Sequence, residues 1–264
     1  MIPLLKARNL SFVATTRDGH DVAGSSTLSW KFDPSAPASQ FDPLPYAKTV
    51  LTTFPLTGTG QSKTLVTDYI SSHGKKASRF IQFGSTGIWQ IPQRTLWVSR
   101  TSPYDKTNAR AIAEDELLGL GGCVLNLAGL WGGSRDPKTW VSRVATTKEG
   151  VKGKTSLHMI NGVDVARAVL AVVGDWDKAH SKRWMITDGF VYDWWSLFAG
   201  WADANGSEDE GGDSEPTEQA RWVYELMQEE GVYALPRSMN ALQRCYFGRE
   251  FWDTFGLAPL KARI

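Results

Sequence analysis

The stretch RFIQFGSTGIW, residues 79–89, carries the pattern that decides the fold. Its first six residues, 79–84, predict a buried strand, and the small and polar residues that follow predict a turn at the carboxyl end of that strand. Two similar segments flank it, with predicted strands at 49–54 and 123–126 that lead into PLTGTG and GLWGGSRDP. Helical patterns separate these strands, at 61–72 and in YDKTNARAIAEDELL. Strands and helices that alternate in this way form a parallel sheet with helices on both faces, so the predicted fold class is doubly wound α/β.

The alternation continues toward both ends of the chain. Residues 1–8 predict the end of a helix, and residues 11–15 predict one more strand of the parallel sheet. On the other side follow a helix near 138–146, a helix in NGVDVARAVLAVV and a late strand in RWMITDG. YDWWSLFAGWADA, TEQARWVYELMQEEG and SMNALQRCYFGREFWDTFG predict helices of a smaller C-terminal lobe. The acidic stretch at 205–219, rich in Gly and Ser, predicts a disordered surface insertion.

Composition narrows the class of protein. The 264 residues carry a net charge of +1 with no basic block, which argues against nucleic acid or an anionic membrane as a partner. No apolar run approaches the ~18 residues that a membrane span needs. The two cysteines lie in apolar surroundings and indicate no disulfide framework, so we expect a reduced, cytoplasmic location. Scattered histidines predict no metal site, and no Gly-x-Ser-x-Gly motif points to a serine hydrolase. The 12 tryptophans indicate either heavy core packing or an aromatic-lined pocket.

The loops that follow the predicted strands are the expected ligand site. In doubly wound sheets a ligand binds beyond the carboxyl ends of the strands. The four loops read TTRDG, PLTGTG, STGIWQ and GLWGGSRDP, and each contains polar residues or glycines that let a ligand approach the backbone closely.

These loops and the helices between them resemble a known family. RFIQFGSTGIW, SPYDKTNARAIAEDELL, VLNLAGLWGGSRDP and INGVDVARAVLAVV are similar, in order and spacing, to successive blocks of the extended and atypical short-chain dehydrogenase/reductases. These are the Rossmann-fold relatives of the nucleotide-sugar epimerases, and the resemblance spans about residues 10–204. It implies a Rossmann-like NAD(P)-binding-type domain at 1–150 and 157–190, and a C-terminal substrate lobe at 191–264.

The resemblance also implies an opening strand and a Gly-x-Gly-x-x-Gly turn, whose glycines bring the cofactor pyrophosphate to a helix N-terminus. Neither is present in this sequence, and GTGQSK does not have the order of a P-loop. Met1 falls inside the first helix of the family pattern. We therefore expect either an N-terminally shortened form of a longer protein or a variant that has lost its cofactor site.

Candidate cofactor contacts follow from the resemblance. An arginine after the second strand of the family suits the 2′-phosphate of NADP, and Arg17 in TTRDG takes that place, although a solvated turn arginine is an equal alternative. The cofactor expected on this basis is NADP, bound weakly or not at all by this chain. The remaining candidates lie at the carboxyl ends of strands: Phe54, Pro55, Leu56 and Leu130.

Candidate catalytic residues follow in the same way. In the family a Ser or Thr binds the substrate oxygen, and a tyrosine with a lysine four residues later transfers the proton. Ser85 or Thr86 matches the first role. Lys106 and Arg110 occupy the tyrosine and lysine positions, either as an altered catalytic pair, with the pKa of Lys106 depressed by burial, or as surface charges on an amphipathic helix.

Candidate substrate contacts complete the site. Arg135 in GGSRDP matches an arginine that meets an anionic part of the substrate, unless it only holds its own loop. Trp131 would line the same pocket, and Trp89 takes the place of a loop tyrosine. Asn161 and Asp164 are expected to hold a helix start and the lobe junction.

Together these residues predict one cleft lined by Phe54, Ser85, Leu130 and Arg135, with Trp131 nearby. The expected function is an NAD(P)-dependent oxidoreductase or epimerase acting on a small polar molecule, impaired in this form by loss of the Gly-rich loop. The alternatives are a cofactor-free binding or scaffold protein on the same fold, or an inactive product of an incomplete gene. Without its opening strand the sheet has unpaired edges, so we expect the chain to close the gap, to pair with another chain, for which a homodimer is one option, or to be poorly stable.

Overall fold

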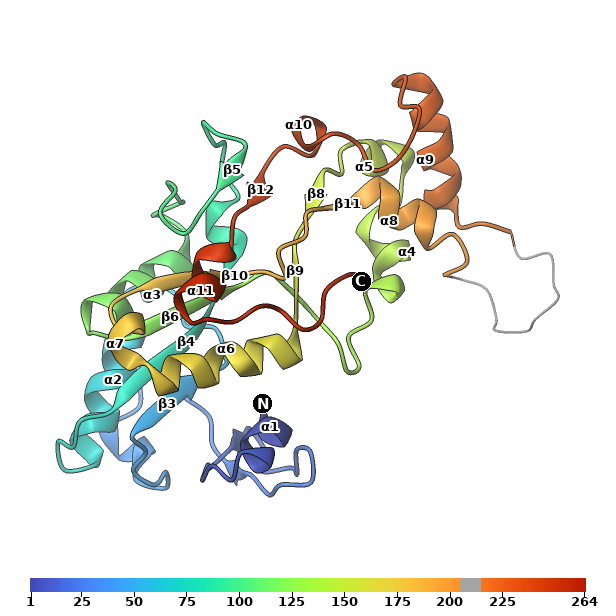
Figure 1. The fold of residues 1–264 in the computed structure, drawn as a ribbon. Coiled ribbons are helices and arrows are strands. Elements are labelled where there is room, and N and C mark those ends of the chain that lie inside the picture. Colours follow the sequence, from blue (N-terminus) through green and yellow to red (C-terminus); the bar gives the residue numbers. More distant parts are fainter. Residues whose placement is uncertain (205–214) are drawn as a thin grey trace.

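A four-stranded parallel sheet forms the centre of the protein, seen in a computed structural model that describes residues 1–204 and 215–264 (Figure 1). Its strands lie in the order β10-β6-β4-β3. They are β3 (Thr49–Thr52), β4 (Arg79–Ser85), β6 (Cys123–Leu127) and β10 (Arg183–Ile186). The structure thus confirms the doubly wound α/β class, and the four strands of the sheet are those predicted at 49–54, 79–84, 123–126 and in RWMITDG.

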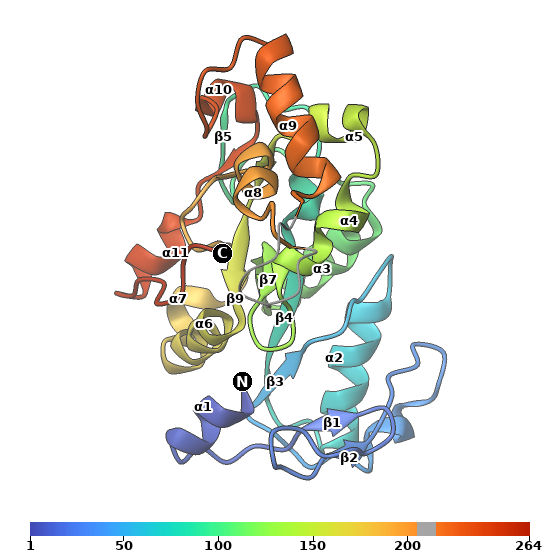
Figure 2. The same cartoon turned by 90° about the vertical axis from the view of Figure 1, so that its right-hand side faces the viewer.

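Helices cover both faces of this sheet (Figures 1 and 2). Residues of α2 (Gln61–Ser72) and α3 (Ala109–Gly119) pack with Phe80 of β4 on one face. Residues of α6 (Gly162–Gly174) pack with Ile81 on the other face, because successive side chains of a strand point to opposite sides. The helix predicted at 61–72 is confirmed with the same bounds.

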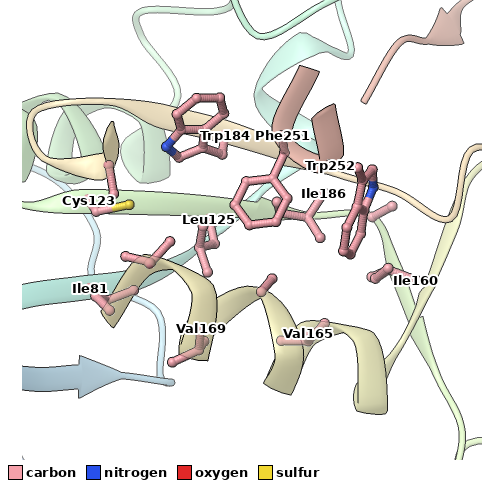
Figure 3. Packing of buried hydrophobic residues seen from close by; sticks show 14 residues of the cluster. Ile81, Cys123, Leu125, Ile160, Val165, Val169, Trp184, Ile186, Phe251 and Trp252 are labelled. Atoms are coloured by element: carbon pink, nitrogen blue, oxygen red, sulfur yellow. The ribbon is translucent and has the colours of Figure 1, made fainter. Parts of the chain in front are cut away.

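The largest apolar cluster lies between the sheet and α6 (Figure 3). Ile81, Leu125 and Ile186 of three neighbouring strands are fully buried there. Phe251 of α11 (Arg249–Thr254) meets Trp184 edge to face, with ring centroids 5.7 Å apart. Each such side chain stabilises the fold by roughly 1.5–3 kcal/mol when fully buried.

The N-terminal segment differs from the prediction. Residues 11–15 do not join the central sheet: only β1 (Thr15–Thr16) forms there, and it pairs in parallel with β2 (Leu28–Ser29) in a separate two-stranded sheet. Leu10 and Val13 therefore stay exposed. Within the described part of the chain β3 is consequently an edge strand, paired only with β4, and no strand flanks its other side. The helix α1 (Ile2–Ala7) precedes this segment.

A helical lobe packs beside the sheet (Figure 1). Its helix α9 (Glu218–Glu229) contacts α8 (Trp194–Gly200) and α5 (Lys148–Lys152). Of the predicted insertion at 205–219, residues 205–214 lie outside the described residues. Thr217 and Gln219 contradict the prediction, because Thr217 caps α9 and buried Gln219 donates to the Ala145 carbonyl.

The last part of the chain returns from the lobe to the sheet domain. After α10 (Met239–Leu242), β12 (Cys245–Tyr246) pairs in parallel with β5 (Trp97–Val98), and α11 then packs on the sheet. The final residues are held by Asp164, which is buried and accepts hydrogen bonds from the backbone N–H groups of Leu260 and Lys261 at 2.9 and 2.8 Å. Asn161 caps α6, so these two residues do hold a helix start and a junction.

Shorter elements complete the described chain, and no helix among them is long and apolar enough to cross a membrane. They are η1 (Ala38–Phe41), η2 (Thr86–Trp89), β7 (Gly129–Trp131), η3 (Pro137–Trp140), α4 (Val141–Val144), β8 (Ser156–Leu157), β9 (Met159–Asn161), α7 (Trp176–Ala179) and β11 (Tyr192–Asp193).

Gly84 provides a test of the packing between β4 and α3. A Cβ at Gly84 would lie 2.5 Å from Glu114 Oε1 and 2.6 Å from Asn126 Nδ2, both fully buried. We expect Gly84→Ala to lower the free energy of unfolding by about 1–3 kcal/mol, as over-packed cores do, measured by urea denaturation. Gly119→Ala is the matched control, because a Cβ there meets nothing within 4 Å. Equal midpoints for both variants would contradict this packing.

Candidate functional site

A cavity of about 390 Å³ opens at the carboxyl ends of β4 and β6. Two short segments after these strands form one wall, and segments from β8, β9 and β12 form the opposite wall. The lining residues are Ser85, Thr86, Gly87, Gln90, Leu127, Ala128, Gly129, Ser156, Leu157, His158, Arg244 and Tyr246. The cavity therefore lies where a doubly wound sheet binds its ligand.

Ser85 ends β4 and is one of the residues that line this cavity. Its Oγ accepts a hydrogen bond from the Gly87 N–H at 3.0 Å, which caps η2. That bond uses a lone pair of Oγ, so the hydroxyl proton can be donated to a ligand oxygen. The Ser85 backbone is fixed from behind, since its N–H donates to Glu114 Oε1 at 3.1 Å and its carbonyl accepts from Asn126 at 3.1 Å.

Glu114 is the buried carboxylate that organises this corner of the sheet. It is fully buried, and Asn126 Nδ2 donates to its Oε2 at 2.7 Å, while Arg183 Nη1 lies 3.5 Å away. Burial raises the pKa of Glu114, and the bond from Asn126 and the charge of Arg183 oppose that effect. Arg183 also pairs with Asp115 of α3. One helix and three strands thus meet at a single polar cluster.

Tyr246 and His158 close the far side of the cavity. The Tyr246 N–H donates to His158 Nε2 at 2.9 Å, and the two rings stack with centroids 4.3 Å apart. The Tyr246 hydroxyl donates to the Thr86 carbonyl at 2.9 Å. Burial, followed by the charge of Arg244, lowers the pKa of His158 to about 3. The imidazole is therefore neutral near pH 7, and because Nε2 accepts, Nδ1 carries the proton.

Arg244 brings a positive charge to the same wall. The residue is half-buried, and its carbonyl accepts a hydrogen bond from Ser156 Oγ at 2.6 Å. The preceding Gln243 has φ +61°, a left-handed conformation that is strained for a residue with a side chain. The backbone conformation of Gln243 is thus set by the surrounding structure rather than by the intrinsic preference of the residue.

Ser85 and Thr86 are the two predicted catalytic residues that the structure brings into the cavity. Lys106 and Arg110 do not line it. Helix α3 begins only at Ala109, so Lys106 lies exposed in the preceding loop, and Arg110 donates to the Phe83 carbonyl at 2.9 Å. Lys106 is therefore not buried, as the altered catalytic pair required, and catalytic roles for Lys106 and Arg110 stay predictions.

The predicted cofactor contacts lie outside the cavity as well. Phe54 packs against Trp30 and Phe32, Leu56 is buried in the core, and Pro55 is exposed. The other two lie on different elements. Leu130 of β7 packs against the main core, and Arg17 is exposed directly after β1.

The predicted substrate contacts are also separate from the cavity. Trp89 is fully buried in the adjacent core and donates to the Ser102 carbonyl. Trp131 is half-buried on β7, and Arg135 is exposed at a turn in which it exchanges backbone hydrogen bonds with Gly132. Of the cleft predicted from Phe54, Ser85, Leu130 and Arg135, only Ser85 lines the cavity.

The sequence did not identify His158, Arg244 and Tyr246 as site residues. They meet because β12 returns from the lobe, so Tyr246 contacts residues 88 and 160 positions away. No local spacing motif reports such a contact. The available signal was weak: a polar pair, Gln243-Arg244, directly before the apolar Cys245 and Tyr246.

The described residues do not fit the pyrophosphate of a dinucleotide. The Gly-rich turn before α2 offers the closest match, with Gly58 and Gly60 in left-handed conformations. Its donors are already used: Gly60 N–H and Lys63 N–H donate to the two oxygens of Glu116, each at 2.9 Å, and Gly58 N–H donates to the Ala109 carbonyl. A carboxylate of the protein thus takes the place that an anionic ligand would need.

The shifted pKa of His158 predicts how stability changes with pH. Its pKa is about 3 in the folded protein against 6.5 for the free side chain, so between these values the unfolded state binds the proton better, and stability falls as the pH falls. Burial raises the pKa of Asp188 to about 6 from 3.8, which has the opposite sign, because acid stabilises its folded form in that window.

We therefore expect His158→Gln to reduce the loss of unfolding free energy between pH 6.5 and 4.5, and Asp188→Asn to steepen it. Urea denaturation at several pH values measures both. Parallel pH profiles for the wild type and His158→Gln would show that His158 is not held neutral in the folded state.

No known protein-family profile matches the chain, and no curated protein matches its sequence. Its fold is nevertheless similar to solved structures. MoeE5 in complex with UDP-glucuronic acid and NAD matches with a TM-score of 0.62 and 14% identity, covering 99% of this chain and 89% of that one. A short-chain dehydrogenase/reductase superfamily protein from Agrobacterium tumefaciens with bound NAD matches with a TM-score of 0.59 and 8% identity, covering 99% and 88%.

A protein from Methylobacillus flagellatus assigned as an NAD-dependent epimerase/dehydratase matches with a TM-score of 0.56 and 18% identity, covering 90% of each chain. Together with the parallel sheet and the cavity at its carboxyl edge, these similarities confirm the resemblance at the level of the fold. The chain has a Rossmann-type fold, similar to the folds of these short-chain dehydrogenase/reductase and epimerase/dehydratase structures.

Proposed function

We propose that this chain is an NAD(P)-dependent oxidoreductase or epimerase-like protein that binds a small polar molecule in the cavity next to Ser85. The observation that carries the proposal is the Ser85 hydroxyl at the carboxyl end of β4, lining a cavity of about 390 Å³. The NAD-bound structures of similar fold support the reaction class. A volume of this size suits a metabolite of modest dimensions.

The chemistry available to the cavity is hydrogen bonding from fixed donors. Ser85 can donate to a carbonyl or hydroxyl oxygen of the ligand, and neutral His158 can donate from Nδ1. Tyr246 stays protonated, because burial raises its pKa. Donors that are already in place stabilise negative charge on a ligand oxygen without reorganisation, which is what carbonyl chemistry requires.

For the cofactor, we propose that residues 1–264 bind NADP weakly or not at all. Arg17 is the candidate contact for a 2′-phosphate, and it is exposed and so accessible. The pyrophosphate, however, finds no open set of backbone donors at the Gly-rich turn before α2, because Glu116 occupies it. A nicotinamide nucleotide supplies hydride chemistry where it is bound, but the described residues do not fit its pyrophosphate.

A second candidate function is a cofactor-free binding protein on the same fold. Two observations favour it. Glu116 occupies the backbone donors of the turn before α2. Among the described residues, the cavity lining also contains no tyrosine–lysine pair that could transfer a proton. This function needs the same cavity but no nucleotide. The two candidates therefore differ in what a nucleotide titration will show.

For the nucleotide we expect weak binding, with a Kd above about 100 μM, because the charge-bearing pyrophosphate lacks its donors. Fluorescence titration of the chain with NADPH and NADH measures it, and Arg17→Gln is the control for the 2′-phosphate. Loss of NADPH preference in that variant would support the contact. Binding of NADPH in the low micromolar range would contradict the weak-binding proposal and exclude a cofactor-free function.

For the small molecule we expect a ligand that is retained through gentle purification and found by native mass spectrometry. Ser85→Ala removes the donor to the ligand oxygen and should weaken retention roughly tenfold, since a hydrogen bond to a buried partner contributes about 0.5–1.5 kcal/mol and an orphaned partner costs more. Ser102→Ala, outside the cavity, is the control. Equal retention by wild type and Ser85→Ala would remove Ser85 from the site.

A further inference from the structure

We infer that the cavity takes an anionic ligand, with a carboxylate or phosphate group bound by Arg244. This inference rests on the proposed function, because it assigns the charge of the molecule expected in that cavity. It moves the anion-binding role from Arg135, which is exposed outside the cavity, to a residue of the returning segment.

Arg244 differs from the other arginines that have a buried nitrogen in having no carboxylate or carbonyl partner. Four arginines of the described chain have a buried guanidinium nitrogen without a hydrogen bond. Three of them are tied through another nitrogen: Arg100 to Glu250, Arg110 to the Phe83 carbonyl and Arg183 to Asp115. Within residues 1–204 and 215–264, Nε of Arg244 has no hydrogen-bond partner, no carboxylate pairs with the guanidinium, and the group it meets is the neutral hydroxyl of Tyr246.

The described part of the cavity lining carries no negative charge. Among residues 1–204 and 215–264 the lining contains no Asp or Glu, and its one histidine is held neutral. The Arg244 guanidinium carbon lies 5.9 Å from the centre of the Tyr246 ring, and His158 stacks on the same ring. Arg244 and His158 are therefore neighbours of Tyr246 in one wall of the cavity. A partly buried cation without a counter-charge is costly, and a guanidinium fork matches a carboxylate or phosphate with two parallel hydrogen bonds.

The segment that carries Arg244 is fixed on both sides of this residue. Ser156 Oγ donates to the Arg244 carbonyl, and His158 Nε2 accepts from the N–H of Tyr246. Gln243 is held at φ +61°, a strained conformation next to a binding residue. The charge is therefore presented by a rigid backbone, which reduces the entropy lost when a ligand binds.

Ser85 lines the same cavity, so the ligand that fits carries an anionic group and a carbonyl or hydroxyl oxygen. A small hydroxy-acid and a small phosphate ester both satisfy this description. Glycolate and inorganic phosphate are the simplest probes of the two anion types, and binding of one or the other distinguishes the carboxylate from the phosphate source.

The test is calorimetric titration of residues 1–264 with each probe at pH 7. We expect binding of at least one probe, at least about tenfold weaker binding in Arg244→Gln, and an intermediate affinity in Arg244→Lys, which keeps the charge but loses the planar fork. Arg249→Gln is the matched control, because Arg249 is exposed on α11 and pairs only with Asp253 among the described residues. Unchanged affinity in Arg244→Gln, or no binding of either probe by the wild type, would overturn the inference.

A second measurement uses the wild-type protein alone, in case Arg244→Gln does not fold. Phenylglyoxal modifies accessible arginines, and mass spectrometry locates the labelled positions. The binding probe should protect Arg244 and leave labelling of Arg249 unchanged, and equal labelling of Arg244 with and without the probe would overturn the inference. A neutral molecule retained in the cavity would contradict the anion inference and leave the proposed function intact. Anion binding without any retained metabolite or nucleotide would support the anion inference and contradict the proposed function.

Discussion

The buried carboxylate of Glu114 fixes the arrangement of the site on the sheet, because its partners must be held around it. A carboxylate removed from water must be surrounded by donors, and here they come from the Ser85 backbone, from Asn126 and, at longer range, from Arg183. These partners belong to β4, β6 and β10. Because one side chain of α3 needs donors from all three strands, it fixes the positions of these strands relative to one another. Gly84 is part of the same requirement, since it leaves the space that the carboxylate fills. Ser85 presents its hydroxyl as it does because its backbone is bound from behind.

The second half of the site obeys a different constraint. His158, Arg244 and Tyr246 come from β9, β12 and the segments beside them, and they are fixed by backbone hydrogen bonds and ring stacking rather than by a charged cluster. The two halves meet at one hydrogen bond, from the Tyr246 hydroxyl to the Thr86 carbonyl. A rigid polar corner on the sheet thus faces a wall in which, among the residues that the structure describes, Arg244 carries the only formal charge.

The central sheet could be predicted because its strands are short apolar runs with turns after them, and Ser85 and Thr86 followed from their place after β4. Residues 11–15 had the same pattern, but a strand forms only where a neighbour pairs with it. In the structure β1 pairs with β2, outside the central sheet. Lys106 lies outside α3 for a local reason, since Asn108 caps the helix and α3 begins at Ala109. The far wall could not be predicted, because its contacts join residues that are distant in the chain and carry no shared motif.

The returning segment has a consequence for how the protein is made. A ribosome releases the sheet strands and the lobe helices in order, and each can begin to pack as it emerges. The wall formed by Arg244 and Tyr246 is translated after both of them, and the bond to Thr86 spans 160 positions. Until then the surface around Ser85 faces water without its cover. The next helix, α11, adds Phe251 and Trp252 to the core on the sheet. A nascent chain therefore completes its binding cavity and the packing of its sheet together, when this returning segment emerges.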